Sequence, residues 1–325
     1  MSELQTQVDV GSSPLIFLVL ILAGIAAVFF YFQKSQDNNQ IPVATAVPAS
    51  SHSKQVPNLP VAAPSTSSLR SNTFSRIKDN YSTVQEVQQA LRKSGLESSD
   101  LIIGVDFTKS NTWQGEKSFQ NKCLHHIEHG KTNPYQEVIA AMGLCLEEFD
   151  DDNIIPAFGF GDTVTRDKSI FCLNPKGGSC NGFRQVLSSY SEKALQVELA
   201  GPTNFEPLIS TAARIARNEK SFHILLIVAD GQVTSKKPTI NSIVAASENA
   251  PLSIIMVGVG DGPWDCMNEF DDELPERNFD NFQFVEFNKS YKGNTENEKI
   301  ANFCKDCLME VPEQFKTIRK LGLLD

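Results

Sequence analysis

The chain has 325 residues, of which 41% are hydrophobic and 21% charged, so it is long enough for one large folded domain with tails or for two small ones. Its net charge of −10 and its pI near 5.1 disfavour a nucleic-acid partner, because no face readily becomes basic enough to collect phosphates. Seven scattered cysteines, an odd number, do not resemble a disulfide framework and indicate a reducing compartment.

The N-terminal part of the chain contains an uncharged apolar run, "PLIFLVLILAGIAAVFFYF", after a short tail of residues 1–13. At about 1.5 Å of rise per residue the run is about long enough to cross a hydrocarbon core of about 30 Å, which predicts a single transmembrane helix over residues 14–33. A cleaved signal peptide and a buried core helix are the alternatives. Lys34 and Lys54 follow the run and no Lys or Arg precedes it. The positive-inside rule then predicts a single-pass membrane protein whose folded domain faces the cytosol.

Residues 34–75 are rich in Ser, Pro, Gln, Asn and Ala and predict a disordered linker, which leaves residues 76–322 for the folded domain. That domain should begin with a capped helix in "STVQEVQQALRKSG", closed by Gly95. Apolar strands then alternate with helical patterns, which predicts an α/β fold with an open, doubly wound sheet and helices on both faces. The predicted strands cover 101–107, 154–159, 169–173, 222–229, 252–259 and 282–287, and the further predicted helices cover 134–149, 181–194, 205–219, 238–249 and 297–319.

Oxygen-bearing side chains follow two of these apolar strands. "LIIGVDFTKSN" ends in Asp106, Thr108 and Ser110, which point to one side if the chain is extended. "FHILLIVA" ends just before Asp230, and "LAGPTNFEPL" places Thr203 in a loop before a helix. Ligands of doubly wound sheets bind at the C-terminal ends of the strands, so we expect these side chains to converge. Two carboxylates and three hydroxyls suit Mg²⁺, and less tightly Mn²⁺ or Ca²⁺; a polar network around water is the alternative.

This pattern resembles the metal-ion-dependent adhesion site of von Willebrand factor A domains: D-x-[ST]-x-S after a first strand, a Thr in the next loop, and an Asp after a hydrophobic strand. Segments such as "NPYQEVIAAMG", "DDNIIPAFGFGD", "SFHILLIVADGQV" and "CLMEVPEQFK" resemble the copine-type A domain, most closely the form found in plant RING domain ligases. The resemblance covers roughly residues 75–318. It implies a mostly parallel sheet with one antiparallel edge strand, and the metal ligands Asp106, Thr108, Ser110, Thr203 and Asp230.

The function implied by the resemblance is protein recognition. In A domains an Asp or Glu of a partner completes the coordination shell of the ion. We therefore expect a membrane-anchored, divalent-metal-dependent interaction module, an adaptor or scaffold, whose partner is a protein that supplies an acidic residue. The alternative is a role in ubiquitin transfer, as a relative of the ligases or as their adaptor, with a partner from the ubiquitin pathway.

Motifs that would indicate an enzyme are weak. "CKDC" at 304–307 is a single C-x-x-C and cannot build the two zinc sites of a RING, so we expect no intrinsic ubiquitin ligase activity. "VGVGDGP" at 257–263 fails the G-x-G-x-x-G spacing of a dinucleotide-binding loop and predicts a turn.

Two further segments could bind metal but favour other roles. "CLHHIEH" at 123–129 would place His125 and His129 on one face of a helix, which makes zinc conceivable, but a surface or packing role is favoured. The acidic stretches at 147–152 and 269–273 lack the spacing of an EF-hand and predict solvated turns.

Overall fold

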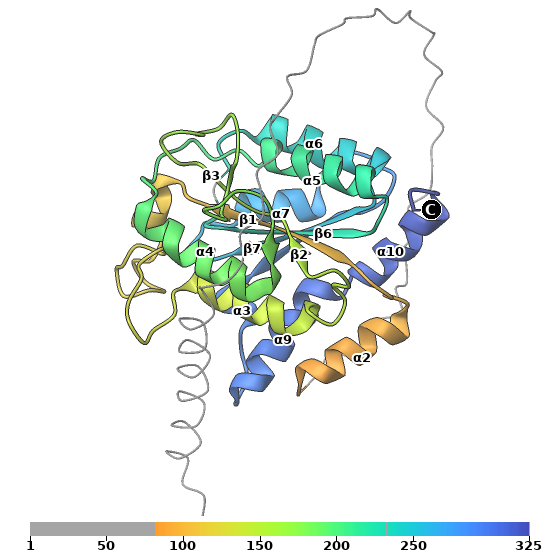
Figure 1. Ribbon diagram of the computed structural model, residues 1–325, viewed down its shortest axis with the longest axis horizontal. Coiled ribbons are helices and arrows are strands. Elements are labelled where there is room, and N and C mark those ends of the chain that lie inside the picture. Colours follow the sequence, from red (N-terminus) through yellow and green to blue (C-terminus); the bar gives the residue numbers. More distant parts are fainter. Residues whose placement is uncertain (1–81, 232, 325) are drawn as a thin grey trace, which may run out of the picture. The chain divides into compact units, whose positions relative to one another are not determined.

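Six apolar strands form the central sheet in the computed structural model, which describes residues 82–231 and 233–324 (Figure 1). Their order is β4-β3-β1-β6-β7-β8, and every neighbouring pair is parallel except β3 with β4. This agrees with the predicted doubly wound, mostly parallel sheet with one antiparallel edge strand. The strands are β1 (Asp100–Asp106), β3 (Ala157–Phe160), β4 (Phe171–Cys172), β6 (His223–Ala229), β7 (Leu252–Gly258) and β8 (Phe282–Glu286), and a separate pair joins β2 (Ile154–Ile155) to β5 (Cys180–Asn181).

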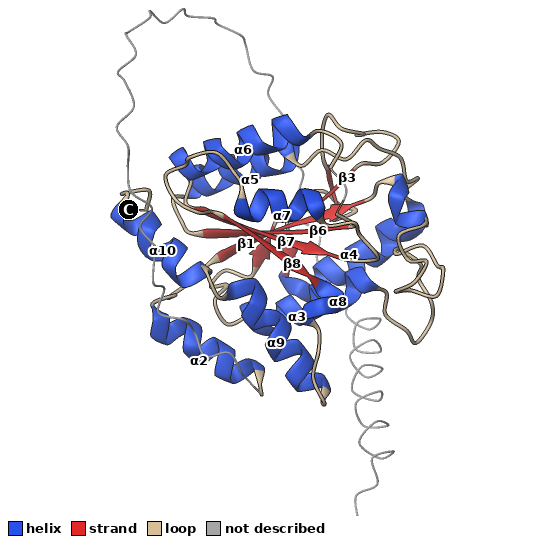
Figure 2. Ribbon diagram, turned by 180° about the vertical axis from the view of Figure 1, so that it is seen from behind, coloured by secondary structure: helices blue, strands red, loops and turns tan. Residues whose placement is uncertain are grey.

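Both faces of the sheet are apolar, because its central strands are apolar at consecutive positions and successive side chains point to opposite sides. In β1, Ile103 and Val105 pack in one core and Ile102 in the other. Helices cover both faces and produce three layers (Figures 1 and 2). One face carries α2 (Val84–Ser94), α3 (Pro134–Leu146), α4 (Gly182–Gln196), α9 (Glu296–Leu308) and α10 (Val311–Lys320), and the other carries α5 (Glu206–Glu219), α6 (Lys236–Asn249) and α7 (Asp265–Asp272).

Two helical regions differ from the prediction. The single helix expected over 297–319 is divided into α9 and α10 at Met309 and Glu310. Pro312 lies in the first turn of α10 and has no N–H to donate to the carbonyl oxygen of Leu308, four residues earlier, with which its ring would also clash in a continuous helix. α9 therefore ends at Leu308. The acidic stretch 269–273, predicted as a turn, lies mostly in α7, whose buried Met267 and Phe270 pack against the sheet.

The predicted transmembrane helix over 14–33 lies outside the described residues, as do the predicted tail (1–13) and linker (34–75). Within residues 82–231 and 233–324, no helix has the length and apolar character needed to cross a membrane. The longest helix of this part, α4, has 15 residues, or about 22 Å, against about 30 Å for a hydrocarbon core. We therefore correct the predictions of a transmembrane helix and of a single-pass membrane protein with its domain facing the cytosol, because the structure gives neither any support.

Candidate metal centre

Two aspartates lie where the two central strands end. β1 and β6 run parallel with Val105 opposite Val228, so Asp106 and Asp230 emerge at the same edge of the sheet. Both side chains are fully buried. Burial, and next the negative charge of Asp230, raise the pKa of Asp106 well above its ordinary value. The two carboxylates are therefore close enough to repel each other.

The hydroxyl oxygens of Thr108 and Ser110 lie 3.0 Å apart, although not for the reason that the sequence predicted. β1 ends at Asp106, and Thr108 begins a 3₁₀ turn, η1 (Lys109–Thr112). Ser110 thus approaches Thr108 through a helical turn and not through the alternation of a strand. The backbone N–H of Thr108 donates to Oδ1 of Asp106 at 2.7 Å, which connects the turn to the carboxylate.

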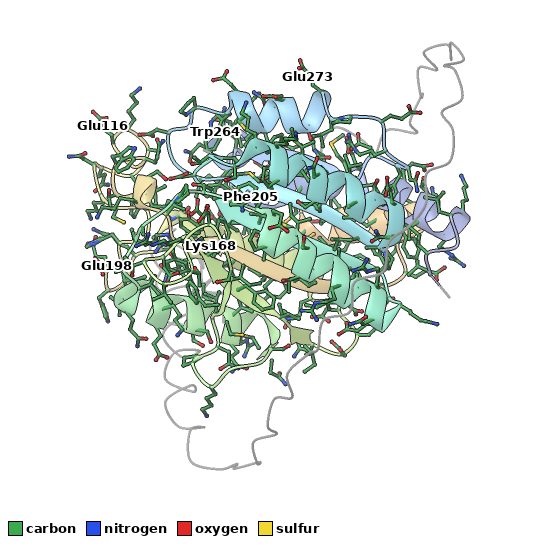
Figure 3. The ribbon with its side chains drawn as sticks, turned by 90° about the horizontal axis from the view of Figure 1, so that it is seen from above. Glu116, Lys168, Glu198, Phe205, Trp264 and Glu273 are labelled. Atoms are coloured by element: carbon green, nitrogen blue, oxygen red, sulfur yellow. The ribbon has the colours of Figure 1, made fainter. Side chains whose placement is uncertain are left out.

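Thr203 reaches the same edge on a loop that is bound to this turn. Ala200 forms a parallel bridge with Thr108, and the backbone N–H of Lys109 donates to the carbonyl oxygen of Ala200. On its other side, the loop is bound to the segment after β6, because the N–H of Thr234 donates to the carbonyl oxygen of Thr203 at 3.0 Å. Glu116 and Glu198, which Figure 3 labels, mark the loops at this end of the sheet. The structure thus brings all five predicted side chains to one edge, each at most 8% exposed.

This donor set fits a hard divalent cation. Oδ2 of Asp106 is buried and accepts no hydrogen bond from any residue that the structure describes. A buried carboxylate oxygen without a donor, next to a second buried carboxylate, is unfavourable unless a positive charge or a proton is added. Carboxylate and hydroxyl oxygens are the ligands that Mg²⁺ and Ca²⁺ prefer.

A buried histidine supports the strand end from behind, and the sequence did not predict this role. Nε2 of His125 lies 2.7 Å from the carbonyl oxygen of Asp106, and Nδ1 lies 2.9 Å from Oη of Tyr190. The ring stacks on Phe107 and Tyr135, with centroids 4.7 and 4.2 Å away. Burial lowers the pKa of His125 to about 3, so the ring is neutral at physiological pH. Nε2–H must then donate to the carbonyl oxygen, and Nδ1 accepts from Tyr190.

Asn111 extends this support along the turn. Its side-chain amide donates to the carbonyl oxygen of Thr108 at 3.1 Å and accepts from Oη of Tyr135 at 2.7 Å. The segment 123–129 is a loop and not a helix, and His129 is exposed whereas His125 is buried. The packing role is therefore the correct one for His125.

The remaining motifs have structural roles. Cys304 and Cys307 are buried in α9, on a helix as predicted, and the thiol of Cys304 donates to the carbonyl oxygen of Ala141. The glycine-rich segment 257–263 contains the last two residues of β7 and the predicted turn after it. Its Asp261 accepts the backbone N–H groups of Lys117 and Ser118 at 2.7 and 2.8 Å, and thereby connects two loops at the candidate metal centre's edge of the sheet.

The mostly parallel sheet and the oxygen-rich edge define a von Willebrand factor A-like α/β domain. The family model of the copines matches residues 123–325, and the chain belongs to the copine family, which confirms the assignment made from the sequence.

Two ligases of Arabidopsis thaliana are among the similar proteins. E3 ubiquitin-protein ligase RGLG1 is 47% identical over 265 residues, which cover 77% of this chain and 54% of the ligase. E3 ubiquitin-protein ligase RGLG5 is 48% identical over 294 residues, which cover 83% of this chain and 67% of the ligase. Copine family protein 2 of Caenorhabditis elegans is 49% identical over 248 residues, 75% of this chain and 3% of that protein. The chain thus spans about half to two thirds of the length of these two ligases.

Solved structures are more distant. The SpRpn10 VWA domain is similar with a TM-score of 0.41 and 12% identity, over 58% of this chain and 87% of that chain. A von Willebrand factor type A protein from Catenulispora acidiphila is similar with a TM-score of 0.39 and 12% identity, over 67% of this chain and 43% of that chain.

Proposed function

We propose that this chain is a divalent-metal-dependent protein-interaction module, an adaptor or scaffold. The observation that carries the proposal is the buried pair of carboxylates at one sheet edge, with Oδ2 of Asp106 lacking a donor among the described residues. When bound, the ion supplies positive charge and an open coordination position for a carboxylate of the partner. The residues that would hold Mg²⁺, or alternatively Mn²⁺ or Ca²⁺, are Asp106, Thr108, Ser110, Thr203 and Asp230.

The chain's own residues orient these ligands before a partner arrives. One oxygen of Asp106 is fixed by the N–H of Thr108, and its backbone carbonyl oxygen is fixed by His125. A site whose side chains are already ordered loses little conformational entropy on binding, so more of the interaction energy remains as affinity.

An exposed aromatic side chain lies beside the candidate metal centre. Trp113 is 54% exposed, and its backbone N–H donates to the carbonyl oxygen of Ser110 at 3.0 Å. Tryptophan is among the residues that contribute most to protein interfaces. The partner that fits this edge therefore carries an acidic residue with an apolar neighbour.

The proposal is tested by the binding of Mg²⁺ and of partners to the full chain. Isothermal titration with Mg²⁺ should give one binding event in the wild type and none in Asp106→Ala. Partners captured by the wild type in Mg²⁺ should be lost in EDTA and in Asp106→Ala. They should remain with Glu116→Gln, which removes an exposed charge from a loop at the same end of the sheet. An identical set of partners in all four conditions would refute the metal-dependent module.

A role in ubiquitin transfer is the second candidate, and what favours it is the identity of 47–48% with proteins named E3 ubiquitin-protein ligases. Discharge of ubiquitin from a loaded conjugating enzyme distinguishes the two functions. With the full chain added we expect the uncatalysed rate. Accelerated discharge would favour a ligase, and tight binding of the chain to such a ligase without acceleration would favour an adaptor.

A further inference from the structure

A second group of carboxylates converges at the opposite edge of the sheet, where β1 and β6 begin. Asp100 is the first residue of β1, and its backbone N–H donates to the carbonyl oxygen of Phe222 at 2.8 Å. The N–H of Ser99 donates to the carbonyl oxygen of Phe149, also at 2.8 Å. These two bonds bring the acidic loop after α3 beside Asp100. As a result, ligand oxygens of Asp100, Asp150 and Asp152 all lie within 4.8 Å of one another.

Two of these carboxylates each use one oxygen to shape the loop. Oδ1 of Asp150 accepts the N–H of Asn153 at 3.2 Å, and Oδ1 of Asp152 accepts the N–H of Ile154 at 2.7 Å. Asp150 is only 8% exposed, and its Oδ2 is buried with no hydrogen-bond donor among residues 82–231 and 233–324. Desolvation of such an oxygen is costly unless a cation or a proton neutralises it.

The surroundings of Asp150 are negative. Burial first, and then the charges of Asp152 and Asp100, raise the pKa of Asp150 to about 6. Asp100 is oriented by the hydroxyl of Ser221, which donates to its Oδ2. His223 lies beside Asp100, with Nε2 3.9 Å from Oδ2 of Asp100, but this nitrogen is only 2.9 Å from Glu219, to which it is hydrogen-bonded. The guanidinium of Arg92 binds to Glu148 and lies over the ring of Phe149.

We propose that Asp100, Asp150 and Asp152 form a second divalent-cation site, which takes Ca²⁺. The three carboxylates each provide one ligand oxygen in this cluster, and Asp152 is exposed to solvent, so water can complete a shell of six to eight oxygens. Mg²⁺ requires a near-ideal octahedron at shorter distances, which a loop of this kind does not impose. The spacing within the acidic stretch 147–152 did not predict this site, because its third ligand, Asp100, lies about fifty residues earlier in the chain.

The test is a Ca²⁺ titration of the full chain in the Asp106→Ala background, which removes the candidate metal centre at the other edge. We expect one Ca²⁺ to bind in this background. Asp150→Asn and Asp152→Asn should each weaken its binding by about tenfold or more, because each removes a charged ligand. Asp151→Asn is the matched control: it removes the same charge from an exposed neighbour in the same loop and should leave the affinity nearly unchanged.

Thermal melting gives a second readout, since Ca²⁺ should raise the Tm of Asp106→Ala and not that of Asp106→Ala combined with Asp150→Asn. If Asp150→Asn does not fold, Asp152→Asn, whose side chain is exposed, decides. Absence of Ca²⁺ binding up to about 10 mM, beyond the range of weak protein sites, would refute the proposal. An equal loss in Asp151→Asn would also refute it, since general surface charge would then explain the binding. Loss of partner binding or of Mg²⁺ binding at the other edge leaves this result unaffected.

Discussion

His125 contributes to the candidate metal centre without being a ligand, because it fixes the backbone carbonyl oxygen of Asp106 while its ring is buried between aromatic side chains. Its pKa is lowered from 6.5 to about 3 in the folded chain. Below pH 6.5 the unfolded chain therefore binds a proton that the folded chain does not. The stability that the neutral ring contributes is complete above pH 6.5 and is lost as the pH falls towards 3.

Urea unfolding between pH 7 and pH 5 measures this effect. We expect the free energy of unfolding of the wild type to fall by about 1.4 kcal/mol per pH unit from His125 alone, once the pH is below 6.5. His125→Gln cannot be protonated and should show a correspondingly shallower slope, at a lower overall stability. If the free energy of unfolding depended equally on pH in the wild type and in His125→Gln, the ring of His125 would be protonated in the folded chain as it is in the unfolded chain.

Asp106 is expected to reduce stability in the absence of metal. Its carboxylate is buried beside that of Asp230, and both burial and that charge raise its pKa. Asp106→Asn retains an oxygen for the N–H of Thr108 but removes one of the two charges. In EDTA we expect the variant to be more stable than the wild type by about 1–3 kcal/mol. Mg²⁺ should raise the Tm of the wild type only. A variant that is less stable in EDTA would show that the charge is already compensated within the protein.

The five predicted ligands and the supporting network differ in how far the sequence reveals them. Asp106 and Asp230 are visible because each follows a strongly apolar strand, and parallel strands end at a common edge. The role of His125 depends on Asn111, Tyr135 and Tyr190, which lie in separate segments and meet only after folding. Neither local periodicity nor spacing contains that information.

The junction between α9 and α10 contains a carboxyl group, that of Glu310, whose ionised form is disfavoured by its surroundings. Glu310 precedes the first turn of α10, and burial first, followed by the charges of Asp280 and Asp271, raises its pKa to about 7. In the unfolded chain the carboxyl ionises near pH 4.5. The folded state is therefore penalised as the pH rises from 4.5 through 7, and the penalty is complete above pH 7.

Glu310→Gln should relieve this penalty. We expect the variant to be more stable than the wild type by about 1–2 kcal/mol at pH 8, after discounting for the partial exposure of the side chain, and equally stable near pH 4.5. Glu313→Gln is the matched control, because Glu313 pairs with Lys316 at 3.5 Å on the surface of the same helix. Chemical denaturation at the two pH values measures the difference. If Glu310→Gln were stabilised equally at both pH values, the ionisation of Glu310 would not be the cause of the gain.

At the scale of the whole domain, local stability should decrease from the central strands of the sheet to its outermost strands. β1 and β6 have strand neighbours on both sides and helices on both faces (Figure 2). β4, by contrast, is a two-residue edge strand. Amide hydrogen exchange under native conditions should therefore be slowest in β1, β6 and β7 and much faster in β4. Protection in β4 equal to that in β6 would indicate that the domain opens only by complete unfolding.

The same difference explains which parts of the fold the sequence predicts. Long, continuously apolar strands such as β6 and β7 have no other stable environment than the middle of a covered sheet, so their place follows from composition. β2 and β5 have two residues each, too few for any periodicity, and their pairing depends on contacts between segments about 25 residues apart. Short elements of this kind are determined by the fold around them.

The position of Trp113 has a spectroscopic consequence. The chain contains two tryptophans. Trp113 is 54% exposed next to the turn after β1, while Trp264 is partly buried against Phe284, in contact range of Gly231 just after Asp230. The indole groups thus flank the two strand ends that carry the candidate metal centre, one in water and one in a less polar environment. The protein contains its own fluorescent reporter there: covering this edge dehydrates Trp113 and shifts its emission to shorter wavelength, without any attached dye.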